Sequence, residues 1–247
     1  MIHHFTTVDS TNTLAVQMAA QGACHGTVIH ADRQSGGRGR GGREFLSPAG
    51  GLYFSLIIKP ELELHDLPLI TLAAGVGLCT GIKQATGVAV QLKWPNDLYS
   101  NDRKLGGVLT ESGPIKSGAV PEFLVIGVGV NVNTDPDQFP SSLRRKVISL
   151  YHHAADSPVD ADRLLKSLVS AMLDAVQRLA VTRQGLLADW RALDYLQGRV
   201  LEYTGHDGMV PATGVGLAGD GRYVIRDHNG VEHKILAGDL NPIKLTS

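Results

Sequence analysis

A loop rich in arginine and glycine is the first segment of the sequence that could do chemistry. Residues 33–45 (RQSGGRGRGGREF) hold four arginines and five glycines, a composition that favours neither a helix nor a packed strand. Because glycine loses the most backbone entropy on folding, such a run stays mobile unless a ligand orders it, and arginine side chains bind anions. Three interpretations follow: an RNA-binding tail, a disordered linker, or a loop that closes over a phosphorylated or carboxylated small molecule.

A second candidate group combines two lysines with a carboxylate in the stretch LKWPNDLYSNDRKLGGVL. Pro95 favours an extended residue before it, and Asn96 with Asp97 favours a turn, which places Lys93 at a strand end beside a carboxylate. Lys104 begins the next expected strand. Because Mg²⁺ is usually held by one or two carboxylates together with substrate phosphates, the group could bind a polyphosphate and its metal. A surface turn with solvated charges is the alternative.

The stretch GVGVNVN, residues 127–133, predicts a strand with one face open to a ligand. Side-chain alternation places Gly127, Gly129, Asn131 and Asn133 on one face and three valines on the other, towards a core. Glycine weakens a strand, and the close approach of a ligand or of another backbone is a common reason for tolerating it. Tight packing of the strand against a helix, or a bulge, would explain the same residues.

Composition restricts the class of protein. The 247-residue chain is 43% hydrophobic and 19% charged, which suffices for a full core in one large domain, or in a large and a small one. Its formal net charge of −1 gives no global basic field for nucleic-acid binding. Cys24 and Cys79 show no disulfide or metal-ligand spacing and fit a reducing compartment. The first residues do not resemble a secretory signal, and the most apolar window, Leu67–Ile82, is shorter than the roughly 20 residues of a membrane span. We expect a cytoplasmic protein that does not associate with membranes.

Alternating helix and strand patterns predict an α/β domain. We expect a helix over residues 11–22 with N-cap oxygens from Asp9 or Ser10, and a long helix from Ser157, where Asp160 could complete a capping box. A further helix is expected over about 66–85, and strands at 27–31, 51–59, 89–94, 104–112 and 122–133. The long helix has an apolar stripe formed by Leu165, Val169, Met172, Val176 and Leu179.

The last fifty residues have a different pattern. Asp-Gly or Asn-Gly pairs end at Gly208, Gly221 and Gly230, each between short stretches of strand composition. Such regular turns predict a small antiparallel barrel or sheet. With the boundary near Gln197, the expected domains are 1–196 and 197–247.

Together these segments resemble the biotin-protein ligases. The matching motifs stand in the family's order: DSTN (9–12), GRGRGGREFLSP (37–48), KWPND (93–97), KLGGVL (104–109) and GVGVNVN (127–133). The resemblance covers the whole α/β domain, whereas the C-terminal region agrees in size and class alone. It implies an α/β (α+β) catalytic domain with a mixed sheet and packed helices, followed by a small SH3-like β-barrel. Because the motifs begin at Asp9, we expect the monofunctional type, a biotin-[acetyl-CoA-carboxylase] ligase with no N-terminal DNA-binding domain and no DNA binding.

The resemblance implies two reactions. Biotin and ATP, with Mg²⁺, give biotinyl-5′-AMP and pyrophosphate, and a lysine of a biotin carboxyl carrier protein or domain then takes the biotinyl group. A carboxylate that attacks an α-phosphate brings two anions together, so catalysis needs alignment and fixed positive charge. Arginines in the loop would supply that charge, and glycines would let backbone N–H groups approach the ligand. A homodimer stays open.

The resemblance also implies roles for individual residues. The expected biotin-binding residues are Ser10, Thr11, Asn12, Gln34, Gly37, Arg38, Gly39, Arg40, Lys104, Gly107, Gly127 and Gly129. The expected ATP- or adenylate-binding residues are Arg40, Arg43, Phe45, Lys93, Asn96, Asp97 and Asn131, with Asp97 as the metal ligand. Lys104 and Arg40 are the expected catalytic residues: Lys104 would bridge the biotin carboxylate and the phosphate, and Arg40 would retain the adenylate. Gly41 and Glu44 stand where relatives can be basic, and Phe45 where tryptophan is frequent.

Two other functions are weighed against this one. A lipoate-protein ligase would share the fold and the acyl-adenylate chemistry, but the pair of motifs GRGRGGR and KWPND favours biotin. A non-enzymatic Arg/Gly module would need an accessible loop and an extended basic surface to bind RNA. The ten histidines show no zinc-enzyme spacing, and structural or solvated roles are expected for them.

Overall fold

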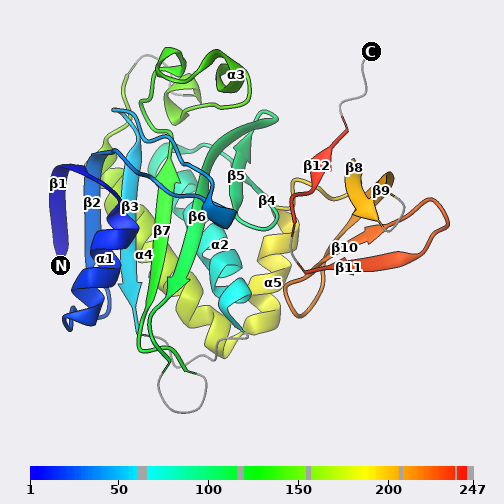
Figure 1. The fold of residues 1–247 in the computed structure, drawn as a ribbon, viewed down its shortest axis with the longest axis horizontal. Coiled ribbons are helices and arrows are strands. Elements are labelled where there is room, and N and C mark those ends of the chain that lie inside the picture. Colours follow the sequence, from blue (N-terminus) through cyan, green and yellow to red (C-terminus); the bar gives the residue numbers. More distant parts are fainter. Residues whose placement is uncertain (60–65, 116–119, 154–156, 206–207, 237, 244–247) are drawn as a thin grey trace.

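The protein is built around a seven-stranded mixed sheet with a five-stranded antiparallel sheet beside it (Figure 1). The computed structural model describes residues 1–59, 66–115, 120–153, 157–205, 208–236 and 238–243. The α/β class and the small antiparallel unit at the C-terminus are those expected from the sequence.

The large sheet has the strand order β1-β2-β3-β7-β6-β5-β4. Its strands are β1 (Ile2–Val8), β2 (Val28–Gln34), β3 (Leu52–Ile58), β4 (Gln91–Lys93), β5 (Asp97–Ser100), β6 (Arg103–Ser112) and β7 (Leu124–Val130). β1 and β2 run parallel, and the other neighbouring pairs are antiparallel. The two central strands, β3 and β7, are buried along their whole length. Strands β1 and β5 were not expected, because β1 is a partly exposed edge strand and β5 follows directly on a turn.

Helices cover both faces of this sheet (Figure 1). One face carries α1 (Thr11–Ala20), which packs on β2, β3 and β7. The opposite face carries α2 (Leu67–Thr86), α4 (Ala161–Val181) and α5 (Arg183–Ala192), of which α5 was not expected. Short helical turns occupy the connections: η1 (Arg40–Gly42), η3 (Pro136–Gln138), α3 (Ser141–Arg144) and η4 (Leu150–His153).

Glycines let α2 and α4 pack closely. A Cβ on Gly77 would lie 2.6 Å from Met172 Cα, and one on Gly81 would lie 3.0 Å from Leu168 Cα. By length and composition the stretch Pro68–Thr86 could cross a membrane, yet 67% of its most apolar window is buried inside the protein. The apolar stretch is therefore longer than the window expected from the sequence, and burial in the core accounts for its composition.

Two helix starts test the capping expectations. Ser10 is the N-cap of α1, as expected, and its Oγ accepts a hydrogen bond from Thr13 N at 3.4 Å. The capping box predicted at Ser157 was wrong, because α4 begins one residue after Asp160. Asp160 is itself the N-cap, and its carboxylate accepts from the backbone N–H three residues later at 3.0 Å. A single aspartate thus caps the helix, in place of the expected pair of residues.

The buried face of α4 is turned slightly from the expected stripe. Val169 and Val176 are partly buried, whereas Leu164, Leu168 and Ala175 are buried. The helix still presents one apolar face to α2 and β3, so the expected packing mode holds.

The small sheet follows α5 and has the strand order β11-β10-β9-β8-β12. Its strands are β8 (Val200–Gly205), β9 (Gly208–Leu217), β10 (Tyr223–Arg226), β11 (Glu232–Ile235) and β12 (Asn241–Pro242). Gly221 and Gly230 occupy the β9–β10 and β10–β11 connections with φ of +84° and +80°, as the turn motifs predicted. The expected turn before Gly208 lies outside the described residues. Among the strands that the structure describes, no pairing of β11 with β12 closes the sheet into a barrel.

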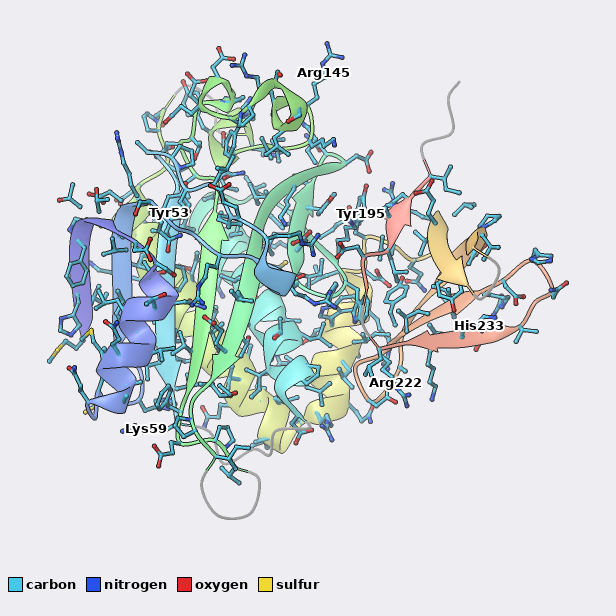
Figure 2. The ribbon with its side chains drawn as sticks, in the orientation of Figure 1. Tyr53, Lys59, Arg145, Tyr195, Arg222 and His233 are labelled. Carbon is cyan, nitrogen blue, oxygen red and sulfur yellow. The ribbon has the colours of Figure 1, made fainter. Side chains whose placement is uncertain are left out.

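Aromatic side chains join the two sheets. Trp94, which follows β4, donates its Nε1–H to Gly221 O at 3.1 Å. The centroids of the Trp94 and Tyr223 rings are 6.0 Å apart. Tyr195, between the sheets in Figure 2, donates to Asp102 Oδ1 at 3.0 Å. These contacts fix the end of β4 against the small sheet, which brings the segment before β12 next to the arginine loop.

Candidate active site

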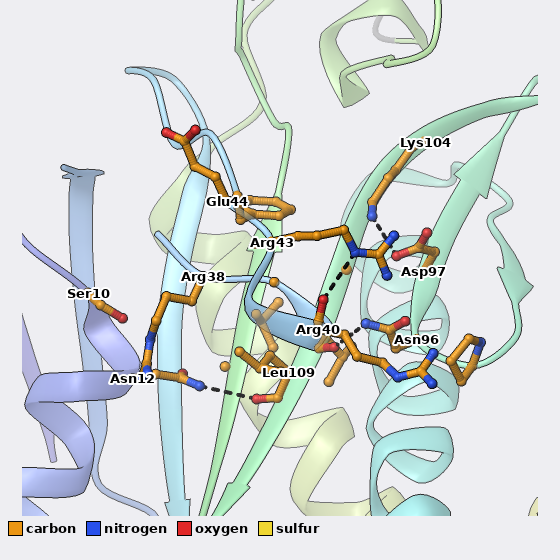
Figure 3. A pocket seen from close by; sticks show the side chains of 18 of the residues that line it. Ser10, Asn12, Arg38, Arg40, Arg43, Glu44, Asn96, Asp97, Lys104 and Leu109 are labelled. Carbon is orange, nitrogen blue, oxygen red and sulfur yellow. Dashed lines mark hydrogen bonds and ion pairs between the residues drawn. The ribbon is translucent and has the colours of Figure 1, made fainter. Parts of the chain in front are cut away.

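One cavity lies over the middle of β6 and β7, between the start of α1, the arginine loop and the β4–β5 turn (Figure 3). It is lined by Ser10, Thr11, Asn12, Gln34, Arg38, Gly39, Arg40, Arg43, Glu44, Phe45, Lys93, Trp94, Pro95, Asn96, Asp97, Lys104, Gly107, Val108, Leu109, Gly127, Val128, Gly129 and Asp239. Figure 3 shows Ser10 and Asn12 at one end and Lys104 with Asp97 at the other. The structure thus brings together every site residue expected from the sequence except Gly37 and Asn131.

A chain of hydrogen bonds fixes the polar end of the cavity. Gln34 Oε1 accepts from Thr11 N at 2.8 Å, and Gln34 Nε2 donates to Ser47 Oγ at 2.8 Å. This arrangement fixes the orientation of the Gln34 carboxamide, because its oxygen and its nitrogen each have a defined partner. The start of α1 and the end of β2 therefore act as one rigid polar wall.

Asn12 is held in the same way from the other side. Its Oδ1 accepts from Ser55 Oγ at 2.6 Å, and its Nδ2 donates to Glu111 Oε2 at 2.7 Å and to Leu109 O at 3.3 Å. Glu111 also accepts from Arg38 Nη2 at 3.0 Å. The side chains at this end are therefore oriented before any ligand arrives, which lowers the entropy cost of binding.

Glycines form the floor of the cavity. A Cβ on Gly127 would lie 2.0 Å from Asn12 Oδ1, and one on Gly129 would lie 2.4 Å from the Phe45 ring. Side chains from α1 and from the loop occupy the space that larger residues in β7 would take. At Gly127 this is the tight packing of the strand against a helix that was the alternative explanation, and close approach of a ligand stays a prediction.

The cationic end of the cavity contains two lysines in different environments. Lys104 Nζ lies 2.6 Å from Asp97 Oδ1, and both side chains are partly exposed. Lys93 is buried, and its Nζ donates to Asn241 Oδ1 at 2.7 Å. Burial lowers the pKa of Lys93, while the charge of Asp97 opposes the shift. As expected, Lys93 ends a strand, and Asp97 is its partner across the β4–β5 turn.

The arginine loop is folded over this end and makes contact with the small sheet. Arg43 binds Asp239 through two hydrogen bonds of 2.6 and 3.1 Å, and Arg40 Nη1 donates to Gly238 O at 2.9 Å. Between the two arginines, Gly41 has φ of +68° and Gly42 of +75°, conformations that favour glycine. The hydrogen bonds to Asp239 raise the pKa of Arg43, and the same contact lowers the pKa of the Asp239 carboxyl.

Cationic side chains outnumber carboxylates in the lining of the cavity. The lining contains five formally cationic side chains (Arg38, Arg40, Arg43, Lys93 and Lys104) and three carboxylates (Glu44, Asp97 and Asp239), a balance of five minus three, or +2. An excess of positive charge in a partly enclosed site attracts anionic ligands.

Two expected residues lie outside the lining. Gly37 is buried within the loop, where a Cβ would lie 2.3 Å from Phe45 O. Asn131 follows the end of β7 at Val130, and its Nδ2 donates to Ile148 O at 3.1 Å. The expected alternation through residue 133 was wrong, because the strand ends three residues earlier and the chain turns away.

Three contributing residues were not found in the sequence analysis. Glu111 stands near the end of β6, between Thr110 and Ser112, where a carboxylate gives no distinct signal in the sequence. Ser55 lies in the middle of the buried strand β3, where a polar residue is a signal for a hydrogen-bonded role. Asp239 gave no signal, because nothing local in the sequence relates it to a loop almost 200 residues away.

Comparisons with known proteins agree with this geometry. The sequence pattern of the biotin/lipoate A/B protein ligase family matches residues 4–131. The bifunctional ligase/repressor BirA of Bacillus subtilis is 35% identical over 170 residues, which cover 68% of this chain and 51% of that protein. A biotin--[acetyl-CoA-carboxylase] ligase of Mycobacterium tuberculosis is 30% identical over 192 residues, covering 74% and 66%.

Solved structures show the same fold. The biotin protein ligase from Aquifex aeolicus in complex with biotin and ATP aligns with a TM-score of 0.82 at 27% identity, over 97% of both chains. The chain spans about half the length of the first curated relatives that it matches, 44 to 53% of each. The family pattern itself covers more than half of this chain. The chain belongs to the biotin/lipoate A/B protein ligase family.

Proposed function

We propose that the protein is an ATP-dependent biotin-protein ligase, a biotin-[acetyl-CoA-carboxylase] ligase that makes biotinyl-5′-AMP and transfers the biotinyl group to a carrier lysine. The observation that carries the proposal is that an ordered polar wall and a cation-rich end meet in one cavity across a floor of glycines. Relatives named as biotin ligases, and a similar fold solved with biotin and ATP, support it.

The polar wall suits the ureido ring of biotin, which offers both N–H donors and a carbonyl acceptor. Ser10, Thr11, Asn12 and Gln34 provide hydroxyl and carboxamide groups that pair with such a ring. Gly127 and Gly129 would let the ring and its valeryl chain lie close to β7. The carboxylate of biotin would then point to the cationic end.

The first reaction forms one bond and breaks one. A biotin carboxylate oxygen attacks the α-phosphorus of ATP, the bond from that phosphorus to the bridging oxygen breaks, and pyrophosphate leaves with the electron pair. Lys104, Arg40 and the other cations at this end would reduce the repulsion between the two anions and stabilise charge on the α-phosphate. Lys104 would exchange its contact with Asp97 for one with the substrates.

Asp97 is the residue that fits a magnesium ion. Its side chain is 20% exposed in the cavity, and a carboxylate with substrate phosphates is the ligand set that Mg²⁺ prefers. When bound, Mg²⁺ would neutralise phosphate charge and orient the leaving pyrophosphate. Asn96 donates to Val108 O at 2.8 Å, which holds the turn carrying Asp97 in place.

The second reaction needs a partner protein. The ε-amine of a lysine on a biotin carboxyl carrier domain attacks the acyl carbon of the adenylate, an amide forms, and AMP leaves. The arginine loop would shield the adenylate from water and from other amines until the carrier binds. We further propose two domains, 1–196 and 197–247, and a cytoplasmic location, which two unpaired cysteines fit.

A direct test compares two substrates. Tag-free protein with Mg²⁺ and ATP should release pyrophosphate with biotin and not with lipoate, whose dithiolane ring has no N–H or carbonyl to pair with the polar wall. Adding a biotin carboxyl carrier domain should yield a product retained by streptavidin. Pyrophosphate release with lipoate alone would favour the lipoate ligase, and salt-dependent RNA retention without pyrophosphate release would favour the RNA-binding module.

A further inference from the structure

Two histidines and an aspartate meet at the free edge of the large sheet, away from the cavity. β1 is the edge strand, and it pairs with β2 in parallel so that His4 lies beside His30. Asp32 is two residues beyond His30 on β2, so its side chain lies on the same face. Val28, also on this face, belongs to the core cluster under α2 and α4, whereas Ile29 belongs to the cluster under α1. The group therefore lies on the face opposite α1.

The side chains are close enough to share an ion. The metal-binding atoms of His4, His30 and Asp32 all lie within 4.8 Å of one another. His4 Nε2 is 2.8 Å from Asp32 Oδ1, and the rings of His4 and His30 stack with centroids 4.9 Å apart. No local spacing in the sequence shows this group, because β-sheet register joins residues 26 and 28 positions apart.

His30 is the buried member of the group. It is 8% exposed, and its ring stacks on that of His4. Burial and the neighbouring His4 lower the pKa of His30, while Asp32 and Asp162 oppose that shift.

We propose that His4, His30 and Asp32 bind one divalent transition-metal ion of the zinc type, which holds the edge strand β1 to β2. Two imidazoles and a carboxylate form a ligand set that suits Zn²⁺, with water in the remaining position. Tetrahedral zinc with bonds of 2.0–2.2 Å needs donor atoms about 3.4 Å apart. The side chains of His4 and Asp32 are 56% and 48% exposed, so small rotations can reach that geometry against the fixed, buried His30.

The proposed site is independent of the ligase function. It lies across the sheet from the cavity and uses none of the residues that line it. An ion there would add a link between β1 and β2, and among the described strands β1 pairs with β2 alone. The alternative is a surface imidazole–carboxylate pair with no affinity for metals.

The test uses tag-free protein treated with EDTA and dialysed, then titrated with Zn²⁺ in a calorimeter. One ion should bind per chain, and Co²⁺ should give visible bands that Zn²⁺ abolishes. Removing a group that only hydrogen-bonds to a metal ligand weakens metal binding by about 10–100-fold, so His4→Ala or Asp32→Ala, which each remove a direct ligand, should weaken it by at least about 100-fold. The matched control is His3→Ala, since His3 pairs with Ile29 on the other face of the same strand.

A second measurement separates the site from histidines elsewhere. Zn²⁺ should slow the hydrogen exchange of β1 amides in the parent protein and in His3→Ala, and should leave that exchange unchanged in His4→Ala. The proposal is overturned if no Zn²⁺ binds, if His4→Ala and Asp32→Ala bind it as the parent does, or if His3→Ala loses it equally.

Discussion

Arg43 and Asp239 are joined by two parallel hydrogen bonds, although 195 residues separate them along the chain. Arg43 belongs to the glycine-rich loop over the cavity, and Asp239 precedes the last described strand of the small sheet. The contact is bidentate, the geometry in which a guanidinium binds a carboxylate most specifically. The order of the loop therefore depends in part on the C-terminal sheet.

Asp239→Asn should loosen the loop without unfolding the protein. The two side chains are 60% and 43% exposed, so the pair contributes no more than about 1 kcal/mol to stability. Hydrogen exchange of residues 36–42 should accelerate, and biotin should restore protection if the loop closes over it. Asp189→Asn is the control, because it breaks an ion pair of similar exposure between Arg178 and Asp189, neither of which lines the cavity. Equal exchange rates in all three proteins would contradict the dependence of loop order on the Arg43–Asp239 contact.

The same pair predicts a pH dependence. Arg43 holds the pKa of Asp239 below its usual value. The stabilisation from this ion pair is therefore fully present above the unfolded pKa of about 4, and it is lost as pH falls through the lower folded-state pKa. Loop exchange, corrected for its intrinsic pH dependence, should therefore show no change of protection in the parent between pH 5 and 8.

Gly127→Ala and Gly129→Ala should show whether the two ends of the cavity bind different substrates. A methyl group on residue 127 would displace Asn12 from Ser55 and raise KM for biotin about 10-fold, the cost of one good hydrogen bond. A methyl group on residue 129 would push the Phe45 ring, so its effect on KM for ATP should exceed that of Gly127→Ala. Gly185→Ala, where the nearest atom is 3.9 Å away, is the neutral control. Equal effects on both substrates would show that the two ends are not separate.

Lys104→Ala should reduce adenylate formation about 10²–10³-fold, the usual cost of removing one electrostatic donor to a transition state. Lys104→Arg should recover little, because the guanidinium is larger and more weakly hydrated than the ammonium that lies 2.6 Å from Asp97. Lys166→Ala removes an exposed lysine of α4 outside the cavity lining and should be neutral. Single-turnover pyrophosphate release measures the step, and near-normal rates in Lys104→Ala would assign the role to another cation.

Asp194, at the junction of the sheets, should make stability fall as pH rises. Burial raises the pKa of this carboxyl to about 6, although it accepts from Tyr223 Oη and Leu196 N at 2.8 Å each. The folded-state pKa of Asp194 is above its unfolded value. Its contribution to the free energy of unfolding is therefore fully present below about pH 4 and is lost as pH rises from 4 to 6, a decrease of at most about 3 kcal/mol. Asp194→Asn should remove that slope in urea denaturation, whereas Asp189→Asn should keep it.

Local sequence patterns predicted the elements that local physics determines. The cap at Ser10, the glycine turns of the small sheet and the apolar strand β3 follow from residue types within a few positions. The edge strand β1 was missed, because its half-exposed residues lack a clear alternation and its partner β2 stabilises it. Helix α5 was missed because it follows α4 after a single residue, Thr182, and the break carries no glycine or proline.

The site was predictable where the residues stand in motifs. Lys93, Asp97 and Lys104 were expected together, and the β4–β5–β6 register brings them together. Glu111 and Asp239 act through contacts made only in the folded chain, so their roles cannot be predicted from composition or from motif spacing. Asn131 was misplaced for a related reason: the end of β7 depends on the partner strands, which stop pairing at Val130.

Arg40→Gly should produce an enzyme that makes the adenylate and releases it. Arg40 Nη1 donates to Gly238 O, so the side chain ties the loop to the C-terminal sheet at the cationic end of the cavity. Charge-assisted hydrogen bonds of this kind are worth roughly 1.5–3 kcal/mol, a factor of ten or more in the residence time of a bound adenylate. Since biotinyl-5′-AMP reacts with exposed amines, bystander lysines of an unrelated protein should become biotinylated, as streptavidin blotting would detect.

The control is Arg33→Gly, which removes an exposed arginine outside the cavity lining and should leave the bystander protein without biotin. A stopped-flow off-rate that is unchanged in Arg40→Gly would show that this arginine does not retain the intermediate.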